Sequence, residues 1–119
     1  MTDNSDVVIP GLLNAILLID ETIALAEKGL LSNPSTEEER SFNRVLLRLK
    51  TEREVLDAEL DAALNARSAV QGPTASQIAQ IGALTDQVEQ AANNNANAGA
   101  RLALIGSVLD LAGKIVRHA

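Results

Sequence analysis

Apolar residues recur at alternating intervals of three and four along three stretches of the chain, 7–31, 36–70 and 74–117. This spacing places them on one face of a helix and is typical of coiled-coil packing. The pattern predicts an all-α protein of three long helices in an antiparallel, up-down-up bundle that forms a single domain over 1–119. The third stretch keeps the spacing longest, at Ile81, Leu84, Val88, Ala91, Asn95, Ala98, Leu102, Ile105, Leu109, Ala112 and Val116.

Two short polar segments separate the stretches, "SNPS" at 32–35 and "QGP" at 71–73. Each is followed by a helix start signal. Ser35 with Glu38, and Thr74 with Gln77, have the spacing of a capping box, in which the two side chains satisfy each other's backbone amides. We therefore expect helices to begin just after Ser35 and Thr74.

The segment "QAANNNANAGARL" at 90–102 leaves two interpretations open. The unbroken apolar register on both sides favours one continuous helix, with Asn95 in a core position where an amide fixes register or oligomeric state, or faces water. Four asparagines and a glycine oppose it, because they cost about 3 kcal/mol relative to alanine in a helix. The alternative is a break near 93–99 and a four-helix bundle.

The first helix and the C-terminal half of the third carry more apolar residues than a three-helix monomer can cover. The excess predicts a homo-oligomer, with a dimer favoured, or a complex with another helical protein. The residues outside the main apolar spacing include Leu13, Leu17, Leu18, Leu25, Leu104, Val108, Leu111 and Ile115.

Small residues recur every seven positions at Thr85, Ala92, Gly99, Gly106 and Gly113. Glycines inside a helix are costly, so this stripe predicts the close approach of another backbone, from the first helix or from a second subunit. Together, the excess apolar residues and the stripe give a predicted interface of Leu13, Leu17, Leu18, Leu25, Asn95, Gly99, Leu104, Gly106, Leu111 and Gly113.

The composition offers little for catalysis. The chain has no cysteine, and its one histidine, His118, lies next to the C-terminus, so the usual ligands of transition metals are missing. Glu54, Asp57 and Asp61 share a helix face, which we interpret as solvated, with Arg53 as the ion-pair partner of Asp57. Arg40, Arg44 and Arg48 form a row that we interpret as a salt-bridged surface. We predict no enzymatic activity, no cofactor and no metal site.

The net charge of −6 contains no basic stripe, which disfavours nucleic-acid binding. The apolar run 7–19 is too short to cross a bilayer and follows acidic rather than basic residues, so we expect no transmembrane segment and a cytoplasmic location. The sequence favours a non-enzymatic helical interaction or assembly module. Alternatives are a small acidic inhibitor or immunity-type protein that binds a basic partner, and an amphipathic protein on a membrane surface, which the missing aromatic anchor disfavours.

Overall fold

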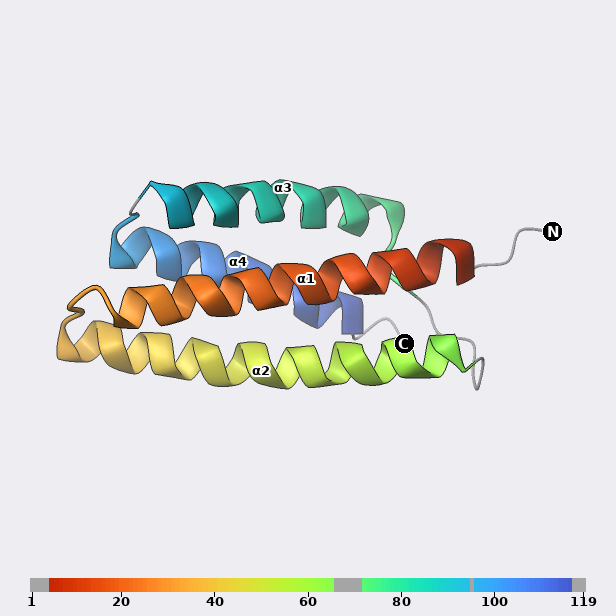
Figure 1. The fold of residues 1–119 in the computed structure, drawn as a ribbon, viewed down its shortest axis with the longest axis horizontal. Coiled ribbons are helices and arrows are strands. Elements are labelled where there is room, and N and C mark those ends of the chain that lie inside the picture. The colour runs from red at the N-terminus through yellow and green to blue at the C-terminus, as the bar shows by residue number, and fades with distance from the viewer. Residues whose placement is uncertain (1–4, 66–71, 95, 117–119) are drawn as a thin grey trace.

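The structure is a computed structural model that describes residues 5–65, 72–94 and 96–116 (Figure 1). Within these residues it contains four helices and no strand: α1 (Ser5–Leu30), α2 (Thr36–Leu64), α3 (Ala75–Asn93) and α4 (Ala98–Val116). The all-α class is confirmed. The three-helix bundle is wrong, and the four-helix alternative has the correct number of helices.

Both predicted capping boxes are confirmed. The Ser35 hydroxyl oxygen accepts a hydrogen bond from the Glu38 backbone amide at 3.1 Å. In return, the Glu38 carboxylate accepts one from the Ser35 backbone amide at 2.9 Å. Thr74 and Gln77 make the same two bonds at the start of α3. The second helix ends earlier than predicted, at Leu64, where the Asn65 amide donates to the Asp61 carbonyl; residues 66–70 lie outside the described residues.

The predicted continuous helix over 74–117 is broken at 94–97, so α3 and α4 are separate helices. Asn94 ends α3 in a non-helical conformation, and the Asn97 side chain accepts the Ala100 amide at 2.8 Å at the start of α4. The intrinsic cost of asparagine in a helix therefore prevailed over the continuous apolar register, whereas Gly99 is inside α4. Asn95, the predicted core amide, lies outside the described residues.

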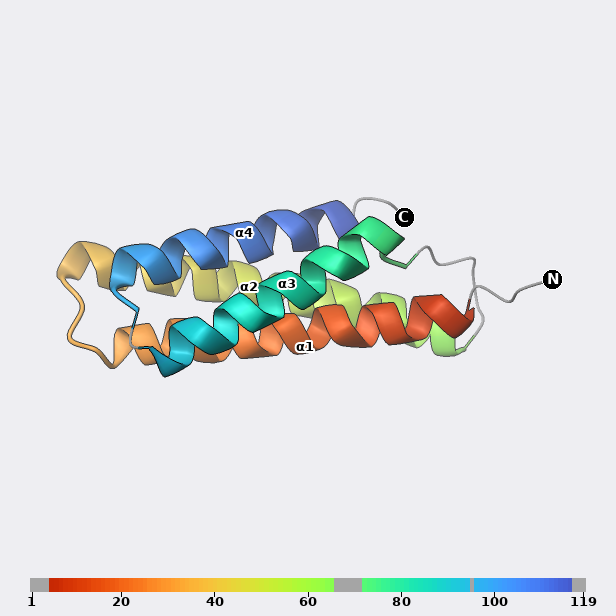
Figure 2. The same cartoon turned by 90° about the horizontal axis from the view of Figure 1, so that it is seen from above.

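The helix directions alternate, as Figures 1 and 2 show, but sequence neighbours do not all pack together. Helix α1 contacts α2, α3 and α4, and α4 contacts α2 and α3, whereas the described parts of α2 and α3 make no contact. The α1–α2 and α3–α4 hairpins thus stack with α2 and α3 on the diagonal. As a result, α2 forms one long edge of the bundle.

The core is aliphatic except for Phe42, and the predicted apolar spacing points into it. Leu12, Ile19, Leu49, Leu56 and Ile105 each expose 1% of their surface or less. Both halves of the third predicted stretch also turn their apolar positions inward, although the helix is broken between them. Each helix buries its own apolar stripe, so the inward positions are correct even where the helix boundaries are not.

Candidate functional site

The predicted interface leucines separate into two groups. Leu18, Leu25 and Leu111 are buried in the core of this chain, and Leu104 is half-buried against it. Leu13 and Leu17 remain about half exposed, at 50% and 53%, one helical turn apart on the outer side of α1. Of the predicted leucines, only these two offer substantial apolar surface to a partner.

The predicted glycine stripe lies on or near the solvent side of α4. Gly99 and Gly106 are exposed and Gly113 is half-exposed. A Cβ atom built on Gly106 or Gly113 would meet no atom within 4 Å, and one on Gly99 would meet only the Asn97 side chain at 3.5 Å. No described backbone of this chain, including that of α1, approaches these glycines closely.

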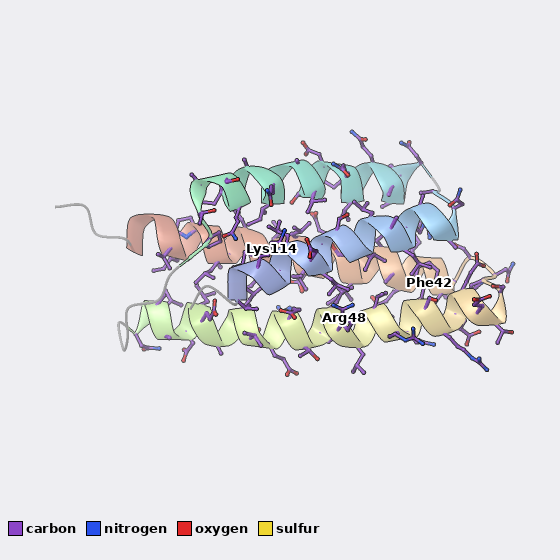
Figure 3. All side chains as sticks on the ribbon, turned by 180° about the vertical axis from the view of Figure 1, so that it is seen from behind. Phe42, Arg48 and Lys114 are labelled. Atoms are coloured by element: carbon purple, nitrogen blue, oxygen red, sulfur yellow. The ribbon has the colours of Figure 1, made fainter. Side chains whose placement is uncertain are left out.

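After an acidic first turn of Glu37, Glu38 and Glu39, helix α2 carries opposite charges on two successive segments, 40–50 and 52–61. Residues 40–50 contain four basic residues and no acid, whereas 52–61 contain five acids and one base. The four basic residues of 40–50 and three of the acids of 52–61 are exposed: Arg40, Arg44, Arg48, Lys50, Glu54, Asp57 and Asp61. Figure 3 shows Arg48 on α2 at the middle of this edge.

Few of these charges are paired within the chain. Among the described residues, the ion pairs are those of Arg53 with Asp20 and with Asp57, each at 2.5 Å, and of Lys114 with Asp110 at 3.2 Å. The predicted Arg53–Asp57 pair is confirmed. The predicted salt-bridged surface around Arg40, Arg44 and Arg48 is not found in the described part of the chain.

Apolar side chains interrupt the charges on the outer face of α2. Leu47 exposes 69% of its surface and Val55 exposes 40%. They lie four residues on either side of Thr51, which is also exposed. Because residues three or four apart share a helix face, Leu47, Thr51 and Val55 form one outward stripe. We call Leu47, Thr51, Val55 and the seven exposed charged residues the α2 face.

Two carboxyl groups lie in partly dehydrated surroundings. Burial raises the pKa of Glu59 above its ordinary value. The pKa of Glu21 is raised first by burial, and then by the charge of Glu89 on α3 and by hydrogen bonding with it. Among the described residues, no group of three or more His, Cys, Asp or Glu side chains is arranged to hold a metal ion.

The segment Val8–Leu30 of α1 has the length and mean hydropathy, 1.8, of a membrane-spanning helix, and 44% of its most apolar window is buried inside the bundle. The core helix of a helical bundle can meet the same criteria of length and hydropathy, because it is apolar where it packs against the other helices. The contacts of α1 with all three other helices fit this interpretation.

Searches against family models, curated proteins and solved structures found no match.

Proposed function

We propose that this protein is a non-enzymatic helical assembly module that pairs with a second copy of itself through the α2 face. The supporting observation is the reversal of charge along α2, with Leu47 and Val55 placed symmetrically about Thr51. A two-fold interface must be self-complementary, because the same surface is used by both subunits. The α2 face has this property when two copies run antiparallel.

The antiparallel arrangement brings the basic segment of one copy alongside the acidic segment of the other. Centred on Thr51, it places Leu47 at the level of Val55 of the second copy, and Arg48 at the level of Glu54. Arg44 then falls between the levels of Glu54 and Asp61 of the second copy, within reach of a long arginine side chain. A parallel arrangement would place like charges opposite each other, which is unfavourable.

The apolar contacts supply the attraction and the charges select the orientation. Exposed ion pairs contribute only about 0.2 to 1 kcal/mol each. Burying Leu47 and Val55 of both copies removes apolar surface from water, which is favourable at about 25 cal/mol per Å². We therefore expect a dimer whose affinity falls as salt screens the charged pairs.

A charge-exchange experiment tests the proposal. In one variant, Arg44→Glu and Arg48→Glu give the α2 face a net negative charge; in the other, Glu54→Lys and Asp61→Lys give it a net positive charge. Each variant alone repels its own copy, so we expect its dimer to weaken on the order of 100-fold. An equal mixture of the two is expected to form a heterodimer, measured by sedimentation equilibrium in about 0.05 M salt.

The matched control is Lys114→Glu. It reverses the charge of an exposed side chain on α4 and leaves the α2 face intact. Its dimer is expected to be unchanged, and circular dichroism verifies that every variant is folded. The proposal is wrong if the natural chain is a monomer at about 100 μM under these conditions, well above micromolar dissociation constants. It is also wrong if the mixed variants stay monomeric.

A further inference from the structure

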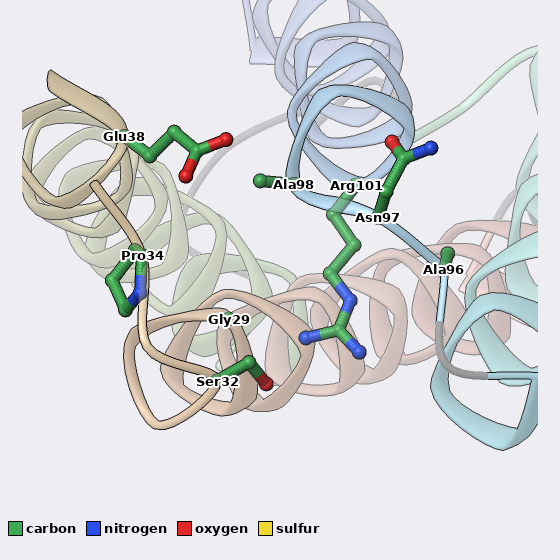
Figure 4. A pocket seen from close by; sticks show the side chains of 8 residues that line it. All are labelled: Gly29, Ser32, Pro34, Glu38, Ala96, Asn97, Ala98 and Arg101. Carbon is green, nitrogen blue, oxygen red and sulfur yellow. The ribbon is translucent and has the colours of Figure 1, made fainter.

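A pocket of about 460 Å³ opens at the end of the bundle where the α1–α2 turn meets the α3–α4 turn. Its walls come from three helices and both turns, and they include Gly29, Ser32, Glu38, Asn97 and Arg101. Figure 4 shows the guanidinium of Arg101 extending from α4 into the space between the two turns. This pocket contains none of the charged residues of the α2 face.

Arg101 is the unusual member of the pocket. It exposes only 3% of its surface, and its Nε atom is buried with no hydrogen-bond partner. Its guanidinium forms no ion pair with any carboxylate of the described residues. Burying a guanidinium without a counter-charge is strongly unfavourable. An anion bound beside Arg101 would offset this cost.

Two oxygen atoms of the pocket side chains accept hydrogen bonds from backbone amides and not from Arg101. One Glu38 oxygen accepts the Ser35 amide at 2.9 Å, which holds this carboxylate at the start of α2. The Asn97 side-chain oxygen accepts the Ala100 amide at 2.8 Å. The C-terminal end of α1 carries partial negative charge near Gly29 and offsets some of the cost of the guanidinium, but it gives Nε no acceptor.

We propose that this pocket binds a small oxyanion, a phosphate or carboxylate group, through Arg101 and the first amides of α4. The planar guanidinium presents paired N–H donors that match two oxygens of such a group. The first amides of a helix lack partners within the helix, and their end of the helix dipole is positive. Ala98 lines the pocket at this end of α4.

The test is a titration of the full chain with inorganic phosphate and, separately, with acetate at pH 7 and constant ionic strength, followed by ¹⁵N NMR. We expect saturable shifts of the Arg101 Nε–H signal and of the Ala98 and Gly99 amides. Arg101→Met should weaken binding at least about tenfold, because a charge-assisted paired contact is lost. Lys114→Met, which removes an exposed cation of α4 outside both the pocket and the α2 face, is the matched control and should leave the titration unchanged.

Arg101→Lys serves as a second variant if Arg101→Met does not fold. It keeps the charge and loses the paired geometry, so binding is expected to weaken severalfold. Saturable binding of either anion that depends on Arg101 supports the proposal, and the stronger of the two identifies the chemistry of the group. Absence of saturation, or shifts that persist unchanged in the Arg101 variants, overturns it without affecting the proposed self-assembly.

Discussion

Gly29 and Phe42 show how one residue's size is fixed by its neighbour. Phe42, the only aromatic residue, is fully buried, and its ring lies over Gly29 near the end of α1. A Cβ atom on Gly29 would lie 2.5 Å from the ring carbon Cζ. Glycine is present here because no larger side chain fits, whereas Gly106 has open space around it.

These two glycines give opposite predictions. Gly29→Ala should lower the free energy of unfolding by about 1 to 3 kcal/mol, because overpacking of the ring outweighs the better helix propensity of alanine. Gly106→Ala should raise it by about 0.5 to 1 kcal/mol, because alanine loses less backbone entropy. Urea unfolding measures both; a destabilising Gly106→Ala would indicate a close neighbour that the single chain does not show.

A second prediction at this scale concerns Glu21. Its raised pKa means that the folded chain holds this proton more tightly than the unfolded chain. The resulting stability is present at low pH and is lost as the pH rises through the folded pKa. Glu21→Gln should therefore stabilise the protein at pH 7, on the order of 0.5 kcal/mol once solvent screening is allowed for, by removing the cost of burying a charged carboxylate and then the repulsion from Glu89.

The pH dependence is the control for Glu21→Gln. The difference from the natural chain should shrink as the pH falls through the raised pKa of folded Glu21 and vanish below the ordinary glutamate pKa of 4.5, because both chains are then uncharged at this position. Thermal unfolding across this range measures it. A stabilisation that is equal at all pH values would mean that the gain has no electrostatic origin.

At the scale of elements, the turn at 94–97 decides the fold. The apolar register predicted a continuous helix because it runs unbroken from Ile81 to Val116. The same register also arises when two helices each bury their own stripe, so the pattern could not distinguish the two cases. At the start of α4 the Asn97 side chain accepts the Ala100 amide, a local hydrogen bond that competes with continuation of the preceding helix.

Asn97 is the residue at which this competition can be measured. Asn97→Ala removes the acceptor for the Ala100 amide and should destabilise the protein by about 1 kcal/mol. Asn97→Asp keeps an acceptor and adds a charge that favours a helix N-terminus, so it should retain or increase stability. Chemical unfolding compares the three chains; equal loss in both variants would show that this cap does not stabilise the turn.

At the scale of the whole molecule, folding α4 back onto the bundle removes one of the two original reasons to expect a partner, the excess apolar surface of the C-terminal segment; Leu13 and Leu17 of α1 stay half exposed. Val108, Leu111 and Ile115 were predicted to exceed what one chain could cover, yet they expose only 0%, 4% and 2% of their surface. Helices α1, α2 and α3 all contribute to the core that contains them. The proposal of self-assembly rests instead on the α2 face, which charge and exposed apolar residues single out.

Arg101 shows what the sequence could not reveal. It stands beside Leu102 in an apolar segment, and nothing in its spacing distinguishes it from a surface arginine on a helix. Its burial follows from the position of the α1–α2 turn against the start of α4, two segments far apart in the sequence. The candidate anion pocket therefore exists only once the two hairpins are stacked.

The sequence by itself determined the helical class, the starts of α2 and α3 and the inward positions along each helix. These depend on interactions between residues three or four apart, which the order of the residues fixes directly. Only the tertiary structure decided that the third stretch is two helices, which leucines are covered and where Arg101 is enclosed. Those outcomes depend on how separate helices share one core, a balance of packing and local cost that no single stretch contains.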